Sequence, residues 1–82
     1  MAKKLNINAR HLSNPGPRLL VENALAKERY TRMRVVVSSL EAADDVQSLF
    51  QSIGAEVEVD QLVDEYHIVA VFPEQEPRTD IQ

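Results

Sequence analysis

A helical repeat over residues 40–53 constrains the fold of this chain more than any other feature of its sequence. Apolar side chains recur there at Leu40, Ala43, Val46, Leu49, Phe50 and Ile53. This spacing places them on one face of an amphipathic helix, which has to pack that face on another layer of structure. Ser38 followed by Glu41 matches a capping box at the start of the helix. Gly54 stands where helices often end in a left-handed residue.

Four short segments have the character of β-strands. They cover residues 5–9, 33–37, 55–61 and 65–72. The first and the third alternate apolar with polar side chains, as half-buried strands do. The second is largely apolar and rich in β-branched valine, which favours a strand.

A further helix is expected between the first two strands, over residues 18–28. The side chains predicted to face inward are Leu19, Leu20, Ala24 and Leu25. Either Ser13 or Asn14 is suited to cap its N-terminus, and Pro15 fits the first turn.

The resulting order, β-α-β-α-β-β, predicts a two-layer α/β sandwich with a four-stranded sheet. Right-handed crossovers place both helices on the same face of that sheet. We expect the folded domain to span residues 5–72, after an N-terminal tail of residues 1–4. Residues 74–80 are polar or turn-forming, and residues 73–82 are expected to be a disordered tail.

Composition excludes several classes of function. The 82-residue chain contains no cysteine, which excludes disulfides and thiolate zinc sites. A net charge of −4 argues against binding to bulk nucleic acid or to a membrane. The two histidines, His11 and His67, are not expected to meet, so we expect neither a metal nor a cofactor. No signal-peptide pattern follows Met1, which points to the cytoplasm.

The segment Asn8-Ala9-Arg10-His11-Leu12-Ser13-Asn14-Pro15-Gly16-Pro17 resembles the signature of the TusA/SirA/YedF family of sulfur-carrier proteins. In that family the pattern Asp-Ala-x-Gly-Leu-x-Cys-Pro-x-Pro ends a first strand and opens a first helix. The positions that match it here are Ala9, Leu12, Pro15 and Pro17. The resemblance extends over about residues 5–72 and implies a mixed sheet of strand order 1-2-4-3, with the fourth strand antiparallel to the others.

Three positions depart from the family pattern. Asn8 replaces Asp, His11 replaces Gly, and Asn14 stands where the family has its sulfur-accepting cysteine. An asparagine amide is neither a nucleophile nor a sulfur acceptor, so no sulfurtransferase activity is expected. Replacement of the glycine implies either that the loop has changed shape or that His11 adopts a positive φ.

Two surfaces are candidate binding sites. The first is the loop and helix start, where unpaired N–H groups and basic side chains suit anions. Its candidate residues are Arg10, His11, Asn14, Pro15, Pro17 and Arg18. The alternative role for Asn14 is that of a helix cap only.

The second surface is the sheet face away from the helices. Its candidate residues are Val36, Val69 and Val71, although strand parity alone does not decide whether 67, 69 and 71 or 66, 68, 70 and 72 face outward. Exposed apolar patches commonly bind protein partners, here another protein or a second copy of the chain. The acidic residues are interpreted as a solvated face.

Three functions follow from these observations. The first is a non-catalytic relative of the sulfur carriers that acts as a protein-interaction or adaptor module. The second is a domain that binds a small ligand or anion at the first helix. The third is a sulfur carrier whose cysteine has been substituted.

Overall fold

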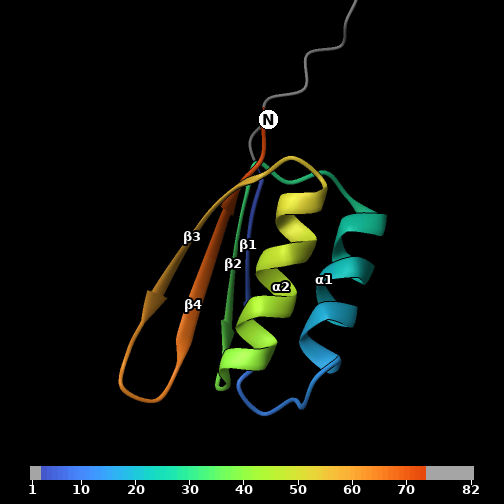
Figure 1. The fold of residues 1–82 in the computed structure, drawn as a ribbon. Coiled ribbons are helices and arrows are strands. Elements are labelled where there is room, and N and C mark those ends of the chain that lie inside the picture. Colours follow the sequence, from blue (N-terminus) through green and yellow to red (C-terminus); the bar gives the residue numbers. More distant parts are fainter. Residues whose placement is uncertain (1–2, 74–82) are drawn as a thin grey trace, which may run out of the picture.

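The computed structural model describes residues 3–73. Its elements are β1 (Lys4–Asn8), α1 (Gly16–Lys27), β2 (Arg32–Val37), α2 (Leu40–Ser52), β3 (Glu56–Gln61) and β4 (Tyr66–Val71) (Figure 1). The predicted element order is confirmed. β1 begins at Lys4, inside the segment predicted as an N-terminal tail. The predicted C-terminal tail lies outside the described residues, apart from Pro73.

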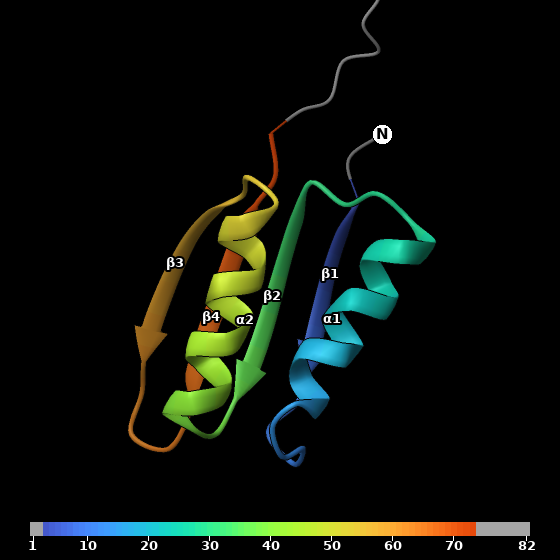
Figure 2. The same ribbon diagram turned by 45° about the vertical axis from the view of Figure 1, so that its right-hand side comes forward.

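The four strands form one mixed sheet of order β1-β2-β4-β3. β1 and β2 are parallel, whereas β4 runs antiparallel to both β2 and β3. Both helices lie on the same face of this sheet (Figure 2). The predicted two-layer α/β sandwich with strand order 1-2-4-3 is therefore confirmed, and no helix of residues 3–73 lies on the other sheet face.

The core lies between α2 and the central strands. On the sheet, the side chains of Met33, Val35 and Ile68 are fully buried. On α2, the side chains of Val46 and Phe50 are fully buried. The ring of Phe50 also meets Phe72 edge to face, with centroids 5.8 Å apart. Burial of these side chains is the main stabilising contribution, at roughly 1.5–3 kcal/mol for each large one.

The inward face of α1 differs from the prediction. Its fully buried side chains are Pro17 and Val21, whereas Leu19 and Leu20 are exposed. The predicted Ala24 and Leu25 pack against the core as half-buried residues. Apolar residues occupy more than one side of this helix, so the periodicity alone did not single out the stripe that faces the sheet.

The ends of α2 are partly as predicted. Ser39, not Ser38, caps the helix: its hydroxyl oxygen accepts a hydrogen bond of 3.1 Å from the Ala42 N–H. Ser38 instead donates its hydroxyl to the backbone oxygen of Arg10, at 2.8 Å. At the other end Gly54 has φ of +89°, which confirms the predicted left-handed residue.

No side chain caps α1, so the prediction of Ser13 or Asn14 as its cap is wrong. Pro15 occupies the N-cap position, and its carbonyl accepts from the Leu19 N–H at 3.0 Å. The Gly16 N–H donates to the backbone oxygen of Ser13 at 2.7 Å. The first of these is the ordinary first bond of the helix, and the second satisfies the Gly16 N–H, whereas Pro17 has no N–H for a capping side chain to accept from.

Candidate functional site

The loop between β1 and α1 is held by one backbone hydrogen bond to β2 and by another within the loop. The Ala9 N–H donates to the Val36 carbonyl at 2.8 Å, and the Leu12 N–H donates to the Ala9 carbonyl at 3.1 Å. The Asn14–Pro15 peptide bond is cis. His11 and Asn14 are exposed on this loop. Within residues 3–73 only a glycine has positive φ, so His11 does not adopt the left-handed conformation.

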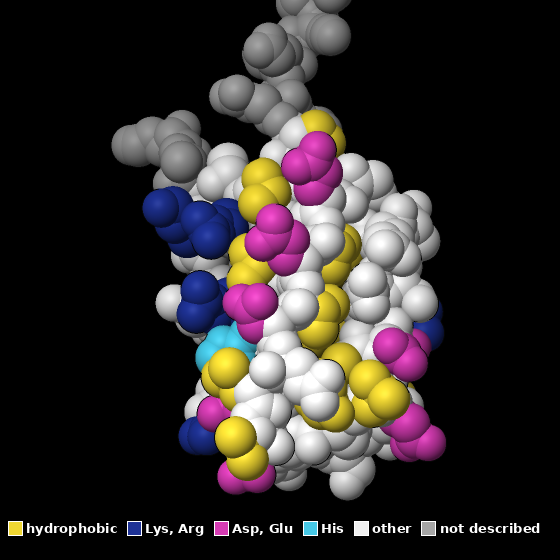
Figure 3. All heavy atoms as spheres, turned by 60° about the vertical axis from the view of Figure 1, so that its left-hand side comes forward, with side chains coloured by type: hydrophobic (Ala, Val, Ile, Leu, Met, Phe, Trp, Pro, Cys, Tyr) yellow, Lys and Arg dark blue, Asp and Glu magenta, His cyan; other side chains and the backbone are white. Residues whose placement is uncertain are grey.

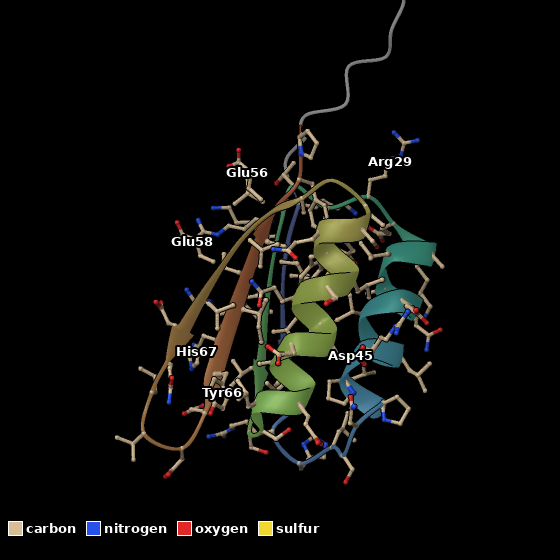
Figure 4. The ribbon with its side chains drawn as sticks, viewed as in Figure 1. Arg29, Asp45, Glu56, Glu58, Tyr66 and His67 are labelled. Atoms are coloured by element: carbon tan, nitrogen blue, oxygen red, sulfur yellow. The ribbon has the colours of Figure 1, made fainter. Side chains whose placement is uncertain are left out.

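The two arginines of the predicted anion site do not converge. Arg18 pairs with Glu22 (Nε to Oε2, 3.1 Å) and with Asp45 (Nη1 to Oδ1, 3.3 Å). Asp45 lies on α2, so this pair links the two helices (Figure 4). Arg10 contacts Oδ1 of Asn8 through Nε at 3.2 Å and Oε1 of Glu65 through Nη1 at 3.6 Å. Each guanidinium is thus engaged by carboxylate or amide oxygens on a different part of the fold.

The open hollow beside Asn14 has an acidic lining. The residues around it are Asn14, Glu41, Asp44, Asp45 and Ser48. Three of these five side chains are carboxylates, and Pro15 and Pro17 supply no N–H donors at the start of α1. The local charge therefore opposes the attraction that a helix N-terminus has for anions.

The described part of the chain offers no metal centre. Among residues 3–73 no group of three His, Cys, Asp or Glu side chains is arranged to hold an ion. His67 lies on β4, with Nε2 3.4 Å from Oε1 of Glu65. That nitrogen is enclosed and makes no hydrogen bond with any described residue. His11 is on the loop before α1.

The outer face of the sheet contains the second set of candidates. Of the two alternatives for β4, His67, Val69 and Val71 point away from the helices, because Ile68 and Ala70 are buried in the core. Val36 and Val69 are half-buried and Val71 is 45% exposed. The structure places all three predicted valines on this helix-free face.

Charged side chains flank these valines in a regular pattern that the sequence analysis missed. Strand register aligns three rows across the face: Lys4, Arg32, Val71 and Glu56; Asn6, Arg34, Val69 and Glu58; and Asn8, Val36, His67 and Asp60. The basic residues all lie on β1 and β2, and the acidic residues all lie on β3. Figure 3 shows the acidic column down the middle of the view, with hydrophobic and then basic side chains to its left.

A signal for this pattern was present in the sequence. Arg32 and Arg34 alternate with buried Met33 and Val35, as Glu56 and Glu58 alternate with Val57 and Val59. Strand parity could therefore have placed the charged residues of each strand on one common face. The register that aligns the charges in rows was not available from parity.

No helix in the described range, residues 3–73, is long and apolar enough to cross a membrane.

Comparison with known proteins identifies the fold. No protein-family model and no curated protein matches the sequence. The structure is similar to the crystal structure of a SirA-like protein from Desulfitobacterium hafniense, with a TM-score of 0.74. The match covers 85% of this chain and 99% of the other, at 19% sequence identity. The chain thus has the α/β fold of a SirA-like protein.

Proposed function

We propose that this chain is a non-catalytic relative of the SirA-like sulfur carriers and acts in the cytoplasm as a protein-interaction module. The likeness of fold supports the relationship. Asn14 occupies the position that the sequence resemblance assigns to the sulfur-accepting cysteine, and the chain has no other cysteine. It therefore has no thiol of its own on which to carry a persulfide.

The outer sheet face is the observation on which the interaction role rests. Val69 and Val71 are neighbours on the outer face of β4, and Val36 lies diagonally across from Val69 on β2; these three residues form an apolar strip at the centre of the sheet. No described helix or loop covers them (Figures 1 and 2). Contiguous apolar surface rimmed by charged residues is typical of protein-binding faces.

Anion binding at α1 is less well supported. It requires Arg10 and Arg18 to be available beside Asn14, but both are paired with carboxylates. The hollow at Asn14 is itself lined by carboxylates. An anionic ligand would have to displace these pairs and approach like charge.

A sulfur carrier with a substituted cysteine is also less well supported. A persulfide carrier needs a thiolate, which positive surroundings stabilise. Glu41, Asp44 and Asp45 line the hollow beside position 14 instead. This environment favours a protonated thiol at that position, so restoring a cysteine is not expected to restore a carrier.

Site-specific photo-cross-linking in the cells of origin tests the interaction role. A photoreactive phenylalanine analogue replaces Val71 on the outer face or, as the matched control, the exposed Ser48 on α2. We expect discrete cross-linked protein products from position 71 and none from position 48. Equal products from both positions, or none from position 71, would overturn the proposal.

A further inference from the structure

The charges of the outer sheet face are separated by strand rather than mixed. Lys4, Arg32 and Arg34 give three positive charges on β1 and β2, and Glu56, Glu58 and Asp60 give three negative charges on β3. The β4 residues His67, Val69 and Val71 lie between the two groups. The face therefore has a positive side, an apolar centre and a negative side.

These opposite charges do not neutralise each other within the chain. In the described part of the protein, none of the six side chains forms an ion pair with another residue. Arg34 and Glu58 are separated by β4, which puts their strands about 10 Å apart at the usual strand spacing. Figure 4 shows Glu56 and Glu58 along β3, the strand at the edge of the sheet.

We infer that this face binds a second copy of the chain, through a two-fold axis that runs parallel to the strands between the two sheets. The inference rests on the proposed interaction role and names its partner. Rotation about this axis places β1 of one copy over β3 of the other, and β2 over β4. Positive sides then face negative sides twice, as an isologous interface requires.

The row pattern agrees with this arrangement in detail. In projection Lys4 of one copy faces Glu56 of the other, and Arg34 faces Val69, next to Glu58. Asn6 and Asn8, on β1 of one copy, face the carboxylates of Glu58 and Asp60 on β3 of the other. Aligned packing of two sheets, rotated by about 30°, keeps these neighbours within reach of long side chains.

The other two-fold axis in the plane of the interface is disfavoured. An axis perpendicular to the strands superposes each strand on its own counterpart. Arg34 then meets Arg34, and Glu58 meets Glu58, in the middle row. Like charges placed against each other oppose association, so charge alone selects the axis parallel to the strands.

A hollow on the positive side is suited to receive the partner. Its lining includes Lys4, Asn6, Arg32 and Arg34. The carboxylates of β3 from the second copy face this hollow in the proposed dimer. The face is small, about 20 Å by 20 Å from strand spacing and rise. Since stable interfaces commonly bury about 800 Å² per partner, we expect a weak, concentration-dependent dimer.

Sedimentation equilibrium of the purified chain, from low micromolar to near-millimolar concentration, tests the inference. The chain should form a monomer–dimer equilibrium. Glu58→Arg should raise the dissociation constant about tenfold or more, and Arg34→Glu should do the same. The double variant, Arg34→Glu with Glu58→Arg, should recover most of the affinity because its face is again self-complementary.

The control is Asp44→Arg on α2, which changes the net charge by the same amount as Glu58→Arg at an exposed position away from the face. It should leave the equilibrium unchanged. Circular dichroism and urea denaturation establish that each variant is folded. A monomer at every concentration, or single variants without effect, or a double variant no better than the singles, would overturn the inference. If the pure chain is monomeric while position 71 cross-links to a different protein, the interaction role stands and only the second copy is excluded.

Discussion

Arg34 and Glu58 stand on either side of Val69 in one cross-strand row of the outer sheet face. The strand between them keeps the two charges from pairing within the chain. In the proposed dimer a second copy brings such charges together and covers the apolar strip between them. This relationship is the basis for our proposal that the helix-free sheet face is an interface.

The proposed pairing makes self-association sensitive to salt. Raising sodium chloride from about 20 mM to about 500 mM shortens the screening length from about 20 Å to about 4 Å. We expect the dimer dissociation constant to rise severalfold over this range, measured by sedimentation. An affinity that is unchanged or increased by salt would indicate that the valines act without the charges.

A cysteine introduced by Asn14→Cys should be a poor nucleophile. The N-terminus of α1 favours a thiolate, but the three carboxylates of the neighbouring hollow oppose it. We expect its thiol pKa to lie at or above the ordinary value, as measured from the pH dependence of alkylation by iodoacetamide.

The control for this experiment removes one of those carboxylates. Asp44→Asn in the Asn14→Cys background should lower the thiol pKa, because it removes a nearby negative charge. A strongly depressed thiol pKa in the Asn14→Cys single variant would instead support the hypothesis of a sulfur carrier with a substituted cysteine.

Substitutions of Ser39 and Ser38 should have different effects on the N-terminus of α2. Ser39→Ala removes the α2 cap and should lower the free energy of unfolding by about 1 kcal/mol. The same substitution should accelerate hydrogen exchange of the Ala42 amide, which loses its acceptor. Ser38→Ala removes the bond to Arg10 and should leave Ala42 exchange unchanged. The reverse assignment of these effects would contradict the observed cap.

Gly54 should resist substitution for a backbone reason alone. A Cβ at this position has no heavy atom within 4 Å, but φ of +89° disfavours any L side chain. Gly54→Ala should cost about 1–2 kcal/mol in urea denaturation, and Gly54→Asn should cost less. If the two variants lost the same free energy of unfolding, the left-handed backbone conformation of Gly54 would not be the cause.

Much of the fold could be predicted from local patterns, because α2, β1 and β3 each have a clear period and β2 is rich in β-branched residues. The face of α1 could not, since Leu19, Leu20 and Val21 are adjacent and only the sheet determines which of them is buried. The predicted cap of α2 was wrong by one residue, because two serines are adjacent at positions 38 and 39.

The candidate site depended more on long-range contacts. Arg18 pairs with Asp45, 27 positions along the chain, and this pair changes the charge around Asn14. The rows of the outer face depend on the register of β2 and β3 against β4. Neither relationship can be predicted from the pattern of a single segment. The residues could therefore be identified from the sequence, but their positions relative to one another could not.

Concentration-dependent NMR spectra of the ¹⁵N-labelled chain test the central claim most directly, because they locate self-association residue by residue. Between dilute and concentrated samples, we predict amide shift changes centred on Val36, Val69 and Val71 and extending along β1 and β3. The exposed positions of α1 and α2 should not change. Shifts confined to the helices, or spectra identical at both concentrations, would contradict the claim that the outer sheet face binds a second copy.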